Sequence, residues 1–260
     1  MLTDRVVLLT CEGDVGVFAE RYLSGHLPGL AVIVERPASR AQLLRRRIKR
    51  LGLAHVAGQL AFMAFQRIQQ KVSKERIAEI IRAAGLDARR APENEMMRNE
   101  TIKVPSVNSP ECIGHLRRLQ PQAILVVGTR IIAGDVLRAV DAPFINYHAG
   151  ITPKYRGVHG GYWAKSEEDL GNFGVTVHLV DAGIDTGDVL YQARLAPTAK
   201  DNYSTYPYLQ LVAALPLLQR AARDAVAGTL RPEKVDLPSH LWSHPTLWHY
   251  IKTGLCRGAW

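Results

Sequence analysis

Cysteine is scarce in this chain of 260 residues, and long apolar runs are missing. The three cysteines, Cys11, Cys112 and Cys256, are odd in number and scattered, which argues against a disulfide framework or a zinc site and for reduced thiols. No run approaches the roughly 20 apolar residues that a membrane span needs. The first residues lack a secretory h-region and a cleavage site. We therefore expect a cytoplasmic protein without a transmembrane span.

Two common nucleotide-binding motifs are also missing. Val6–Gly16, around the end of the first strand-like run, contains neither G-x-G-x-x-G nor a Walker lysine, so a dinucleotide or ATP site there has little support. His148, His159 and His178 do not form an H-x-x-x-H pattern. We therefore expect no metal site.

Positive charge dominates the sequence. The formal net charge is +9, and much of it lies in Arg40–Arg50 and Arg67–Arg76. Such a run is most often the solvated face of a helix, and the sharper alternative is a phosphate-bearing partner. Aromatic residues do not interleave with these cations, which argues against a platform for single-stranded nucleic acid. We expect no nucleic-acid partner and leave a phosphate-bearing small molecule open.

The chain opens with the pattern of a βαβ unit. A strand is predicted over Arg5–Thr10, a helix over Val15–Leu23 and a second strand over Leu30–Glu35. Ala41–Ala84 has helical periodicity with a break near Gly52. The apolar content of 47% is enough for a sizeable core, in one large domain or one domain with a small appendage.

Strands and helices continue to alternate along the chain. This pattern predicts an α/β fold with a mostly parallel central sheet flanked by helices, followed by a helical and aromatic C-terminal extension. The remaining predicted elements are, in order, a strand at Ile102–Val104, a helix capped by Ser109 and ending near Leu119, a strand at Ala123–Val127, a strand at Pro143–Tyr147, a helix at Tyr162–Asp169, strands at Gly174–Val180 and Val189–Gln192, a helix at Tyr208–Val226 and a tail at Leu241–Trp260.

The most informative residues are Asn146 and His148, at the carboxyl end of the strand predicted over Pro143–Tyr147. Residues two apart on a strand point to the same side, so an amide and an imidazole lie side by side. Open α/β sheets bind ligands at this edge. Asp185 would raise the pKa of His148 and orient the imidazole or a water. An amide that stabilises an oxyanion beside an acid–base imidazole suits acyl transfer.

Two stretches carry a resemblance to a known family. The first is INYHAGITPKYRG, from Ile145 to Gly157, and the second is GVTVHLVDAGIDTG, from Gly174 to Gly187. In this order and at this separation they resemble the formyltransferase family that uses 10-formyltetrahydrofolate. That family includes glycinamide ribonucleotide, methionyl-tRNA and sugar N-formyltransferases. The strong likeness covers Ala123–Gln192.

The resemblance implies a Rossmann-like formyltransferase fold. Residues 1–200 would form the catalytic domain, with the helical segment 41–84, and residues 201–260 the C-terminal helix and tail. The implied activity belongs to one-carbon metabolism: an amine attacks the formyl group of the donor 10-formyltetrahydrofolate and a tetrahedral oxyanion forms. No metal is implied.

The resemblance also implies roles for individual residues. Asn146 would donate to the oxyanion, His148 would carry the proton or donate a second hydrogen bond, and Asp185 would support His148. His178 would hold a supporting position behind them, with Thr176 as its polar neighbour. The residues placed around the donor are Gly128, Thr129, Arg130, Ile131, Ile132, Asp181, Ala182, Gly183 and Ile184.

Several departures from the family pattern narrow the acceptor. Gly150-Ile151-Thr152-Pro153 replaces the more frequent Ser-Leu-Leu-Pro, and Arg130 stands where a small or apolar residue is common. The turn Cys11–Asp14 lacks the Gly-Ser-Asn type of loop that holds the phosphate of glycinamide ribonucleotide. The stretch after Gln192 does not have the pattern of the β-barrel domain of the tRNA enzyme. The front end has no room for the regulatory domain of the hydrolases. The prediction is therefore a small amine acceptor, best a nucleotide-linked amino sugar.

Two alternatives to this function stay open. One is a formyltetrahydrofolate hydrolase, which passes the formyl group to water. The other is an idle homologue that binds RNA or an anionic membrane through the basic stretch Arg40–Lys74. Trp242, Trp248 and Trp260 favour packing of the tail or a dimer contact over a platform for sugar, so a homodimer through the tail is also left open.

Overall fold

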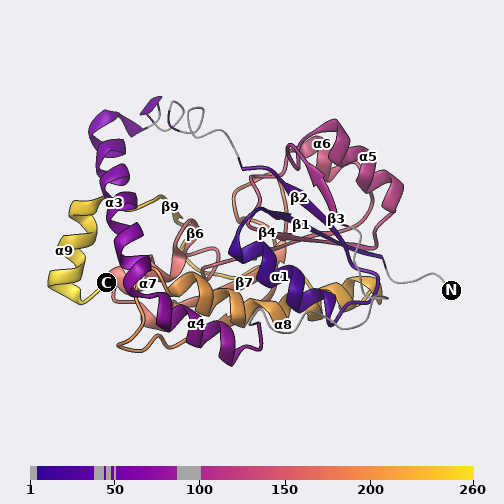
Figure 1. Cartoon of the computed structure of the whole chain (residues 1–260). Helices are drawn as coiled ribbons and strands as arrows, with labels where there is room; N and C mark the ends of the chain where they lie inside the picture. The colour runs from indigo at the N-terminus through magenta and orange to yellow at the C-terminus, as the bar shows by residue number, and fades with distance from the viewer. Residues whose placement is uncertain (1–4, 38–43, 45–47, 50, 87–100) are drawn as a thin grey trace.

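A seven-stranded sheet forms the centre of the computed structural model, which describes residues 5–37, 44, 48–49, 51–86 and 101–260 (Figure 1). The strand order is β3-β2-β1-β4-β5-β7-β8. The first five strands in this order pair in parallel, whereas β7 is antiparallel to both β5 and β8. The strands are β1 Val6–Cys11, β2 Ala31–Glu35, β3 Thr101–Val104, β4 Ala123–Val127, β5 Phe144–His148, β7 Gly174–Leu179 and β8 Val189–Arg194.

The predicted α/β class and mostly parallel sheet are confirmed, and each predicted strand has its counterpart. The continuous apolar run of β4 is buried along its whole length between β1 and β5, as expected for a central parallel strand. Alternate residues of β1 serve two cores, since Val6 and Leu8 pack on one face of the sheet and Val7 and Leu9 on the other.

Helices cover both faces of the sheet. Helix α1 (Asp14–Ser24) and the long helix α8 (Tyr206–Val226) pack on the face of Val6 and Leu8. Helix α5 (Pro110–Leu119) and the short α6 (Gly134–Leu137) pack on the other face. The Ser109 side chain accepts a hydrogen bond from the Cys112 amide at 3.2 Å, so this residue is the predicted N-cap of α5.

A second group of helices lies at the end of the molecule away from β3 (Figure 1). It contains α3 (Leu53–Val72), α4 (Lys74–Ala83), α7 (Gly160–Ser166) and α9 (Leu247–Arg257), and a 3-10 turn, η2, follows at Leu170–Asn172. The predicted break near Gly52 is where α3 begins. None of the helices in the described ranges is long and apolar enough to cross a membrane.

The C-terminal tail returns to the middle of the chain. Strand β9 (Leu241–Trp242) pairs in parallel with β6 (Arg156–Gly157), a pairing that the sequence did not predict because neither segment has a period to detect. The Trp242 indole stacks on Trp163 at 4.3 Å and its N–H donates to the Lys154 carbonyl at 3.2 Å. Trp242 therefore packs against α7 and the segment before β6, whereas Trp248 is exposed.

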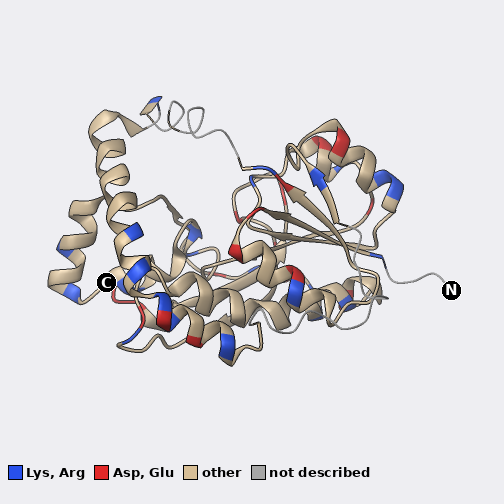
Figure 2. Ribbon diagram, viewed as in Figure 1, with Lys and Arg blue, Asp and Glu red and all other residues tan. Residues whose placement is uncertain are grey.

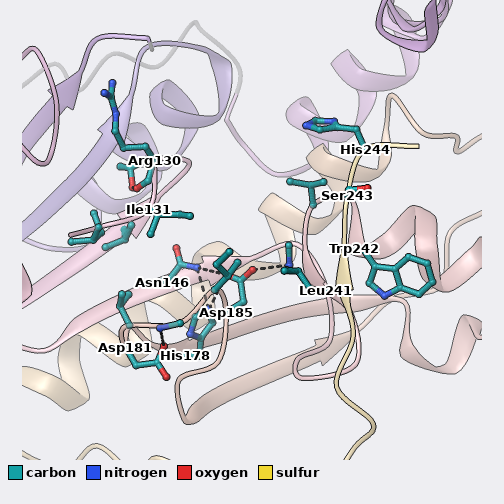
Figure 3. Close-up of a pocket in the computed structure, with 18 of the residues that line it drawn as sticks. Arg130, Ile131, Asn146, His178, Asp181, Asp185, Leu241, Trp242, Ser243 and His244 are labelled. Carbon is teal, nitrogen blue, oxygen red and sulfur yellow. Dashed lines mark hydrogen bonds and ion pairs between the residues drawn. The ribbon is translucent and has the colours of Figure 1, made fainter. Parts of the chain in front are cut away.

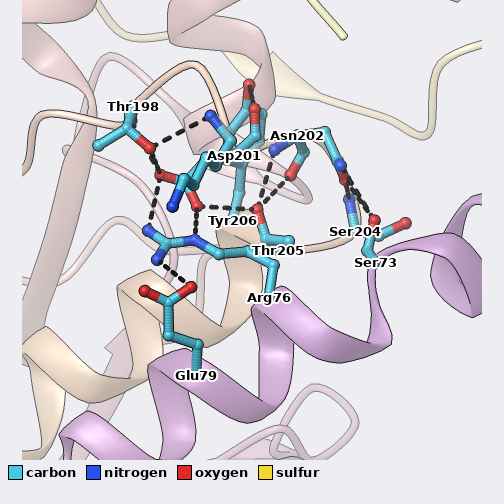
Figure 4. A network of polar contacts seen from close by, with 10 residues as sticks. Ser73, Arg76, Glu79, Thr198, Asp201, Asn202, Ser204, Thr205 and Tyr206 are labelled. Atoms are coloured by element: carbon cyan, nitrogen blue, oxygen red, sulfur yellow. Dashed lines mark hydrogen bonds and ion pairs between the residues drawn. The ribbon is translucent and has the colours of Figure 1, made fainter.

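A polar network joins α4 to the loop before α8 (Figure 4). The Asp201 carboxylate is 1% exposed and accepts hydrogen bonds from Arg76 at 2.8 and 3.2 Å. It also accepts from the Thr198 amide at 2.8 Å and the Thr198 hydroxyl at 2.7 Å. Ser73 and Asn202 extend the network. The network fixes the second group of helices against the sheet domain.

Candidate functional site

The antiparallel register of β5 and β7 places Asn146 directly opposite His178. Side chains of paired residues project on the same side of a sheet and touch, and the Asn146 Nδ2 atom lies 3.1 Å from His178 Nε2. The other ring nitrogen of His178, Nδ1, donates to the Leu179 carbonyl at 2.7 Å. The remaining ring nitrogen, Nε2, therefore lies between the Asn146 amide and Asp185 Oδ1, which is 3.6 Å away.

Asp185 lies in the loop between β7 and β8, and its side chain faces Asn146 and His178. Its Oδ1 atom is 3.5 Å from Asn146 Nδ2, and its Oδ2 atom accepts from the Gly157 amide at 2.8 Å. The Arg156 guanidinium donates to the Ile184 carbonyl at 3.0 Å. Strand β6 therefore holds the Asp185 loop against the end of β5.

His148 lies behind Asp185 and is buried. Its Nε2 atom donates to the Tyr155 carbonyl at 2.6 Å, and its Nδ1 atom is 3.4 Å from Asp185 Oδ2. Both ring nitrogens therefore face protein groups, and His148 does not line the cavity described below. The sequence predicted side-by-side placement of Asn146 and His148; the structure brings both to Asp185, but only Asn146 reaches the cavity.

Burial dominates the pKa of His148 and lowers it, against the opposing effects of the Asp185 carboxylate and the Tyr155 carbonyl. The expected rise caused by Asp185 is present but is outweighed by desolvation. Burial also acts to raise the pKa of Asp185, but His148, His178 and the Gly157 amide lower it to about 2. Asp185 is therefore a carboxylate at neutral pH, available to accept a proton.

Thr176 and the loop after β5 support this arrangement. The Thr176 hydroxyl is buried, accepts from the Thr152 amide at 3.0 Å and donates to the Gly150 carbonyl at 2.8 Å. Gly150 is packed so closely that a Cβ there would lie 2.7 Å from His148 Nε2 and 2.5 Å from the Tyr155 carbonyl. Thr176 thus fixes the loop that contacts His148, rather than contacting the cavity.

Asn146, His178 and Asp185 line the base of a cavity of about 660 Å³ (Figure 3). The loop after β4 and the turn after β7, predicted to surround the donor, form one wall together, and Gly128 and Ala182 alone of those predicted residues do not line it. Val126, Ile132 and Val180 make part of this wall apolar. The wall residues from the prediction are Thr129, Arg130, Ile131, Ile132, Asp181, Gly183 and Ile184.

Arg130 and Asp181 hold this wall in place. Arg130 Nε lies 2.6 Å from Glu35 Oε2, and the Arg130 amide donates to the other oxygen of Glu35 at 2.7 Å. Asp181 Oδ1 accepts from the Gly183 amide at 3.0 Å and from the Thr186 hydroxyl at 2.7 Å. Asp181 therefore is a turn residue, and Arg130 ties its loop to β2.

The opposite wall was missed by sequence reasoning. It is formed by Leu51 and Gln59 around α3 and by Leu241–His244 after β8 in the tail (Figure 3). These residues are far from the two motifs in sequence, and no local pattern marks them as site residues. Arg40–Arg50, the basic run for which a phosphate-bearing partner is left open, falls mostly outside the described residues, so that alternative stays open.

Comparison with known proteins decides the family. Residues 68–208, more than half of the chain, match the family model described as formyl transferase. The chain belongs to the formyl transferase family. The resemblance seen in the two motifs is thereby confirmed. Among the described residues of this family member, no cluster of three or more His, Cys, Asp or Glu could hold a metal ion.

Sequence relatives of this family member are methionyl-tRNA formyltransferases. The protein of Caldanaerobacter subterraneus subsp. tengcongensis is 31% identical over 160 residues, which cover 59% of this chain and 51% of the relative. The protein of Pelotomaculum thermopropionicum is 40% identical over 93 residues, covering 35% and 29% of the two chains. The chain thus spans about half the length, or less, of the curated relatives it matches.

Solved structures of the family share the fold. Glycinamide ribonucleotide transformylase 1 from Symbiobacterium toebii aligns with a TM-score of 0.56 at 18% identity, covering 89% of this chain and 95% of that one. An N-formyltransferase from Helicobacter canadensis, solved with folinic acid and dTDP-3-aminofucose, aligns with a TM-score of 0.55 at 17% identity, covering 93% and 71%. At these identities the likeness concerns the fold alone.

Proposed function

We propose that the protein transfers the formyl group of 10-formyltetrahydrofolate to the amine of a small hydroxyl-bearing acceptor, with a nucleotide-linked amino sugar as the best candidate. The observation that carries this proposal is the cluster of Asn146, His178 and Asp185 at the base of a cavity, with His148 behind it. An amide donor, a carboxylate base and a buried imidazole are the groups that acyl transfer to an amine needs.

The apolar wall fits the donor. Val126, Ile132 and Val180 offer a surface for a flat pterin ring, and the backbone of the Asp181–Asp185 turn offers polar groups at its edge. The bound donor supplies the formyl carbon that the amine attacks. The opposite wall, formed around α3 and by the tail, then faces the acceptor.

Each polar residue at the base of the cavity, and His148 behind them, has a distinct task in this proposal. The Asn146 N–H that makes the long 3.5 Å contact to Asp185 is the one available to the formyl oxygen, while the other N–H faces His178. Asp185 accepts the proton that the attacking amine releases. His148 Nδ1 carries no proton while Nε2 donates to the Tyr155 carbonyl, so this atom, 3.4 Å from the second carboxylate oxygen, accepts a hydrogen bond from Asp185 once that carboxyl is protonated. His178 positions the Asn146 amide.

Gln59 points to the chemistry of the acceptor. Its side chain is 1% exposed, and its Nε2 atom donates to the His244 carbonyl at 2.8 Å. Its Oε1 atom is buried and has no hydrogen-bond partner within the described part of the chain. An acceptor atom in this position lacks a donor, which a hydroxyl group of a bound sugar would supply. The Helicobacter canadensis structure with an amino sugar nucleotide makes this class the first to test.

Methionyl-tRNA is the second candidate acceptor. Its support is the name of the sequence relatives and the net charge of +9, which favours a polyanion. The two candidates differ in size and in salt dependence, since a tRNA complex releases counterions and weakens steeply with salt. A hydrolase and an idle homologue remain as the outcomes in which no acceptor is formylated.

A product assay separates these readings. The protein is incubated with 10-formyltetrahydrofolate and, separately, with dTDP- and UDP-linked amino sugars, with methionyl-tRNA and without acceptor, and formylated product and free formate are quantified. Formylation of an amino sugar nucleotide, lost in Asn146→Ala, is the expected result. Formate release without formylated product would identify a hydrolase, and no turnover with any acceptor would contradict the proposal.

The acceptor side is tested by Gln59→Leu. Loss of the hydrogen-bond partner should raise the acceptor KM about tenfold while the donor KM stays unchanged. The exposed Gln70→Leu on the same helix is the matched control and should leave both constants unchanged. An unchanged acceptor KM in Gln59→Leu would remove this side chain from the acceptor site.

A further inference from the structure

Exposed apolar side chains are concentrated on two helices. Ten of the 14 large apolar residues that are exposed in the described parts of the chain lie on α3, on α9 or at Trp260. On α3 they are Leu53, Leu60, Met63, Phe65, Ile68 and Val72. Soluble proteins rarely leave such a group uncovered without a partner.

Helix α3 presents its apolar residues on both sides. Its inner side carries the buried Val56, Gln59 and Phe62. Its outer side, by helical spacing, carries Leu60 and Ile68 together with alanines, where a surface helix normally carries polar residues. The outer side therefore has the composition of a buried face.

Helix α9 continues this surface. Trp248, Ile251 and Leu255, spaced by three and four residues, form one exposed stripe. Gly58 allows the two helices to touch, because a Cβ there would lie 2.1 Å from the Trp248 ring. Figure 1 shows α3 and α9 side by side. We call the exposed apolar side chains of these two helices the α3–α9 face.

The charge at the α3–α9 face has one sign. Neither helix contains Asp or Glu, whereas Arg67 and Lys71 lie on α3 and Lys252 and Arg257 on α9 (Figure 2). Arg257 lies 3.6 Å from the exposed carboxylate of Glu168, outside both helices. The other three cations are exposed at the edge of the apolar surface.

We infer that the α3–α9 face docks on an anionic lipid surface. Apolar and aromatic side chains flanked by Lys and Arg are the features of helices that lie in a bilayer interface, where tryptophan is also favoured. A second copy of the chain would bring basic edges together with no carboxylate on either helix to compensate them. Since Gln59 lies on the inner side of α3, docking would leave the cavity on the protein side of that helix.

Vesicle co-sedimentation of the full chain tests this inference. Vesicles of phosphatidylcholine alone are compared with vesicles of equal parts phosphatidylcholine and phosphatidylglycerol. We expect binding to the anionic vesicles, weakened by high salt because exposed charges are screened. Each of Lys71→Gln and Lys252→Gln should lower the partition coefficient about fivefold. Absence of binding to anionic vesicles, or equal binding to both kinds, would overturn the inference.

Apolar variants locate the contact. The triple variant Trp248→Ser, Ile251→Ser, Leu255→Ser and the double variant Leu60→Ser, Ile68→Ser should each lose more than tenfold in partition, which sums the loss of several buried apolar groups. Val17→Ser and Leu170→Ser, exposed elsewhere, should not change it. Thermal melts identify any variant that fails to fold. If one of the two serine variants fails, vesicle binding of the other variant tests the inference.

Sedimentation velocity supplies the remaining decision. Wild-type protein should be monomeric without vesicles. If it is instead a dimer that the serine variants convert to monomers, the α3–α9 face is a contact between copies of this chain and the inference is wrong. Vesicle binding that survives in both serine variants would equally overturn it.

Discussion

Asp185 depends on residues from three separate parts of the chain. His148 lies at the end of β5 behind the carboxylate, the Gly157 amide on β6 and His178 on β7. Burial by itself would keep this carboxyl protonated more often, and only these polar neighbours lower its pKa to about 2. The ionised state of Asp185 therefore depends on its neighbours, and a change in any one of them would change the pKa of this carboxyl.

Removal of the polar side chains at the base of the cavity, or of His148 behind them, should abolish most turnover. Asn146→Ala, His148→Ala and Asp185→Ala should each lower kcat by about 100-fold or more, since one oxyanion or base contact is worth roughly 3–4 kcal/mol in comparable sites. Their effects should be far from additive because the groups act as a unit. Steady-state kinetics of the single and double variants measures this.

Asp188→Asn is the matched control for Asp185→Ala. Asp188 lies three residues further along the same loop but is not among the residues that line the cavity. Turnover in this variant should match wild type. Full turnover in His148→Ala would show that a buried imidazole behind Asp185 is not needed.

The lowered pKa of His148 should appear in the pH dependence of stability. The folded-state pKa lies below its ordinary value of 6.5, so the unfolded chain binds the proton first as pH falls. The stability associated with neutral His148 is present above about pH 6.5 and is lost as the pH falls toward the lowered value. His148→Gln should therefore flatten the fall in Tm between about pH 7.5 and about pH 5.

Two other groups set the controls for this measurement. Burial also lowers the pKa of His249, so the double variant with His249→Gln should remove more of the slope. Asp185 contributes in a separate window, because its pKa is lowered from 3.8 and its stabilisation is lost only at lower pH. A slope in His148→Gln identical to wild type would contradict the assigned direction.

At the scale of elements, the loop after β5 is built around the absence of a side chain. Gly150→Ala would place a Cβ against the Tyr155 carbonyl and His148 Nε2, at 2.5 and 2.7 Å. We expect a loss of about 1–3 kcal/mol in the free energy of unfolding and a lower kcat, because the His148 ring must move. Urea denaturation and kinetics measure the two effects.

A glycine in open space provides the comparison. A Cβ at Gly114, inside α5, has no atom within 4 Å. Gly114→Ala should stabilise the protein by about 0.5–1 kcal/mol, since alanine loses less backbone entropy in a helix. Equal effects of the two substitutions would show that the loop after β5 adapts freely.

The network of Arg76 and Asp201 makes a further prediction about elements. Arg76→Met would leave the Asp201 carboxylate buried with only the Thr198 and Thr205 hydrogen bonds. The cost should be somewhat below the roughly 3–5 kcal/mol of a fully buried pair, because the Arg76 side chain is 21% exposed. Glu79→Gln, which removes the exposed partner of Arg76, should change the stability little. Equal losses of unfolding free energy in Arg76→Met and Glu79→Gln would show that the Arg76–Glu79 pair on the surface of α4, and not the bond to Asp201, causes the effect.

At the scale of the molecule, donor binding should stabilise the whole chain. Folinic acid at about 100 times its Kd adds about 2.7 kcal/mol, which for a chain of this size raises the Tm by roughly 5–10 °C. Val180→Glu, which places a carboxylate in the apolar wall, should abolish the shift, and the exposed Val17→Glu should not. Differential scanning fluorimetry measures both, and an unchanged shift in Val180→Glu would move the donor to another wall.

The sequence by itself determined the elements whose signals are contiguous. The apolar run of β4, the Ser109 cap of α5 and the break at Gly52 all depend on a few neighbouring residues. The sequence also placed Asn146 and His148 at the end of a strand, where the structure has them, because the apolar pattern of β5 stops there. Their roles stay a prediction. The division into residues 1–200 and 201–260 stays a prediction.

Only the tertiary structure decided how these residues share the site. The register of β5 against β7 brings His178 to Asn146, and the pairing of β6 with β9 brings the tail wall to the cavity. Such pairings join residues far apart in the chain, and no local period encodes them. Burial lowers the pKa of His148, although the Asp185 carboxylate acts to raise it. This burial likewise exists only when the whole chain has packed around the ring.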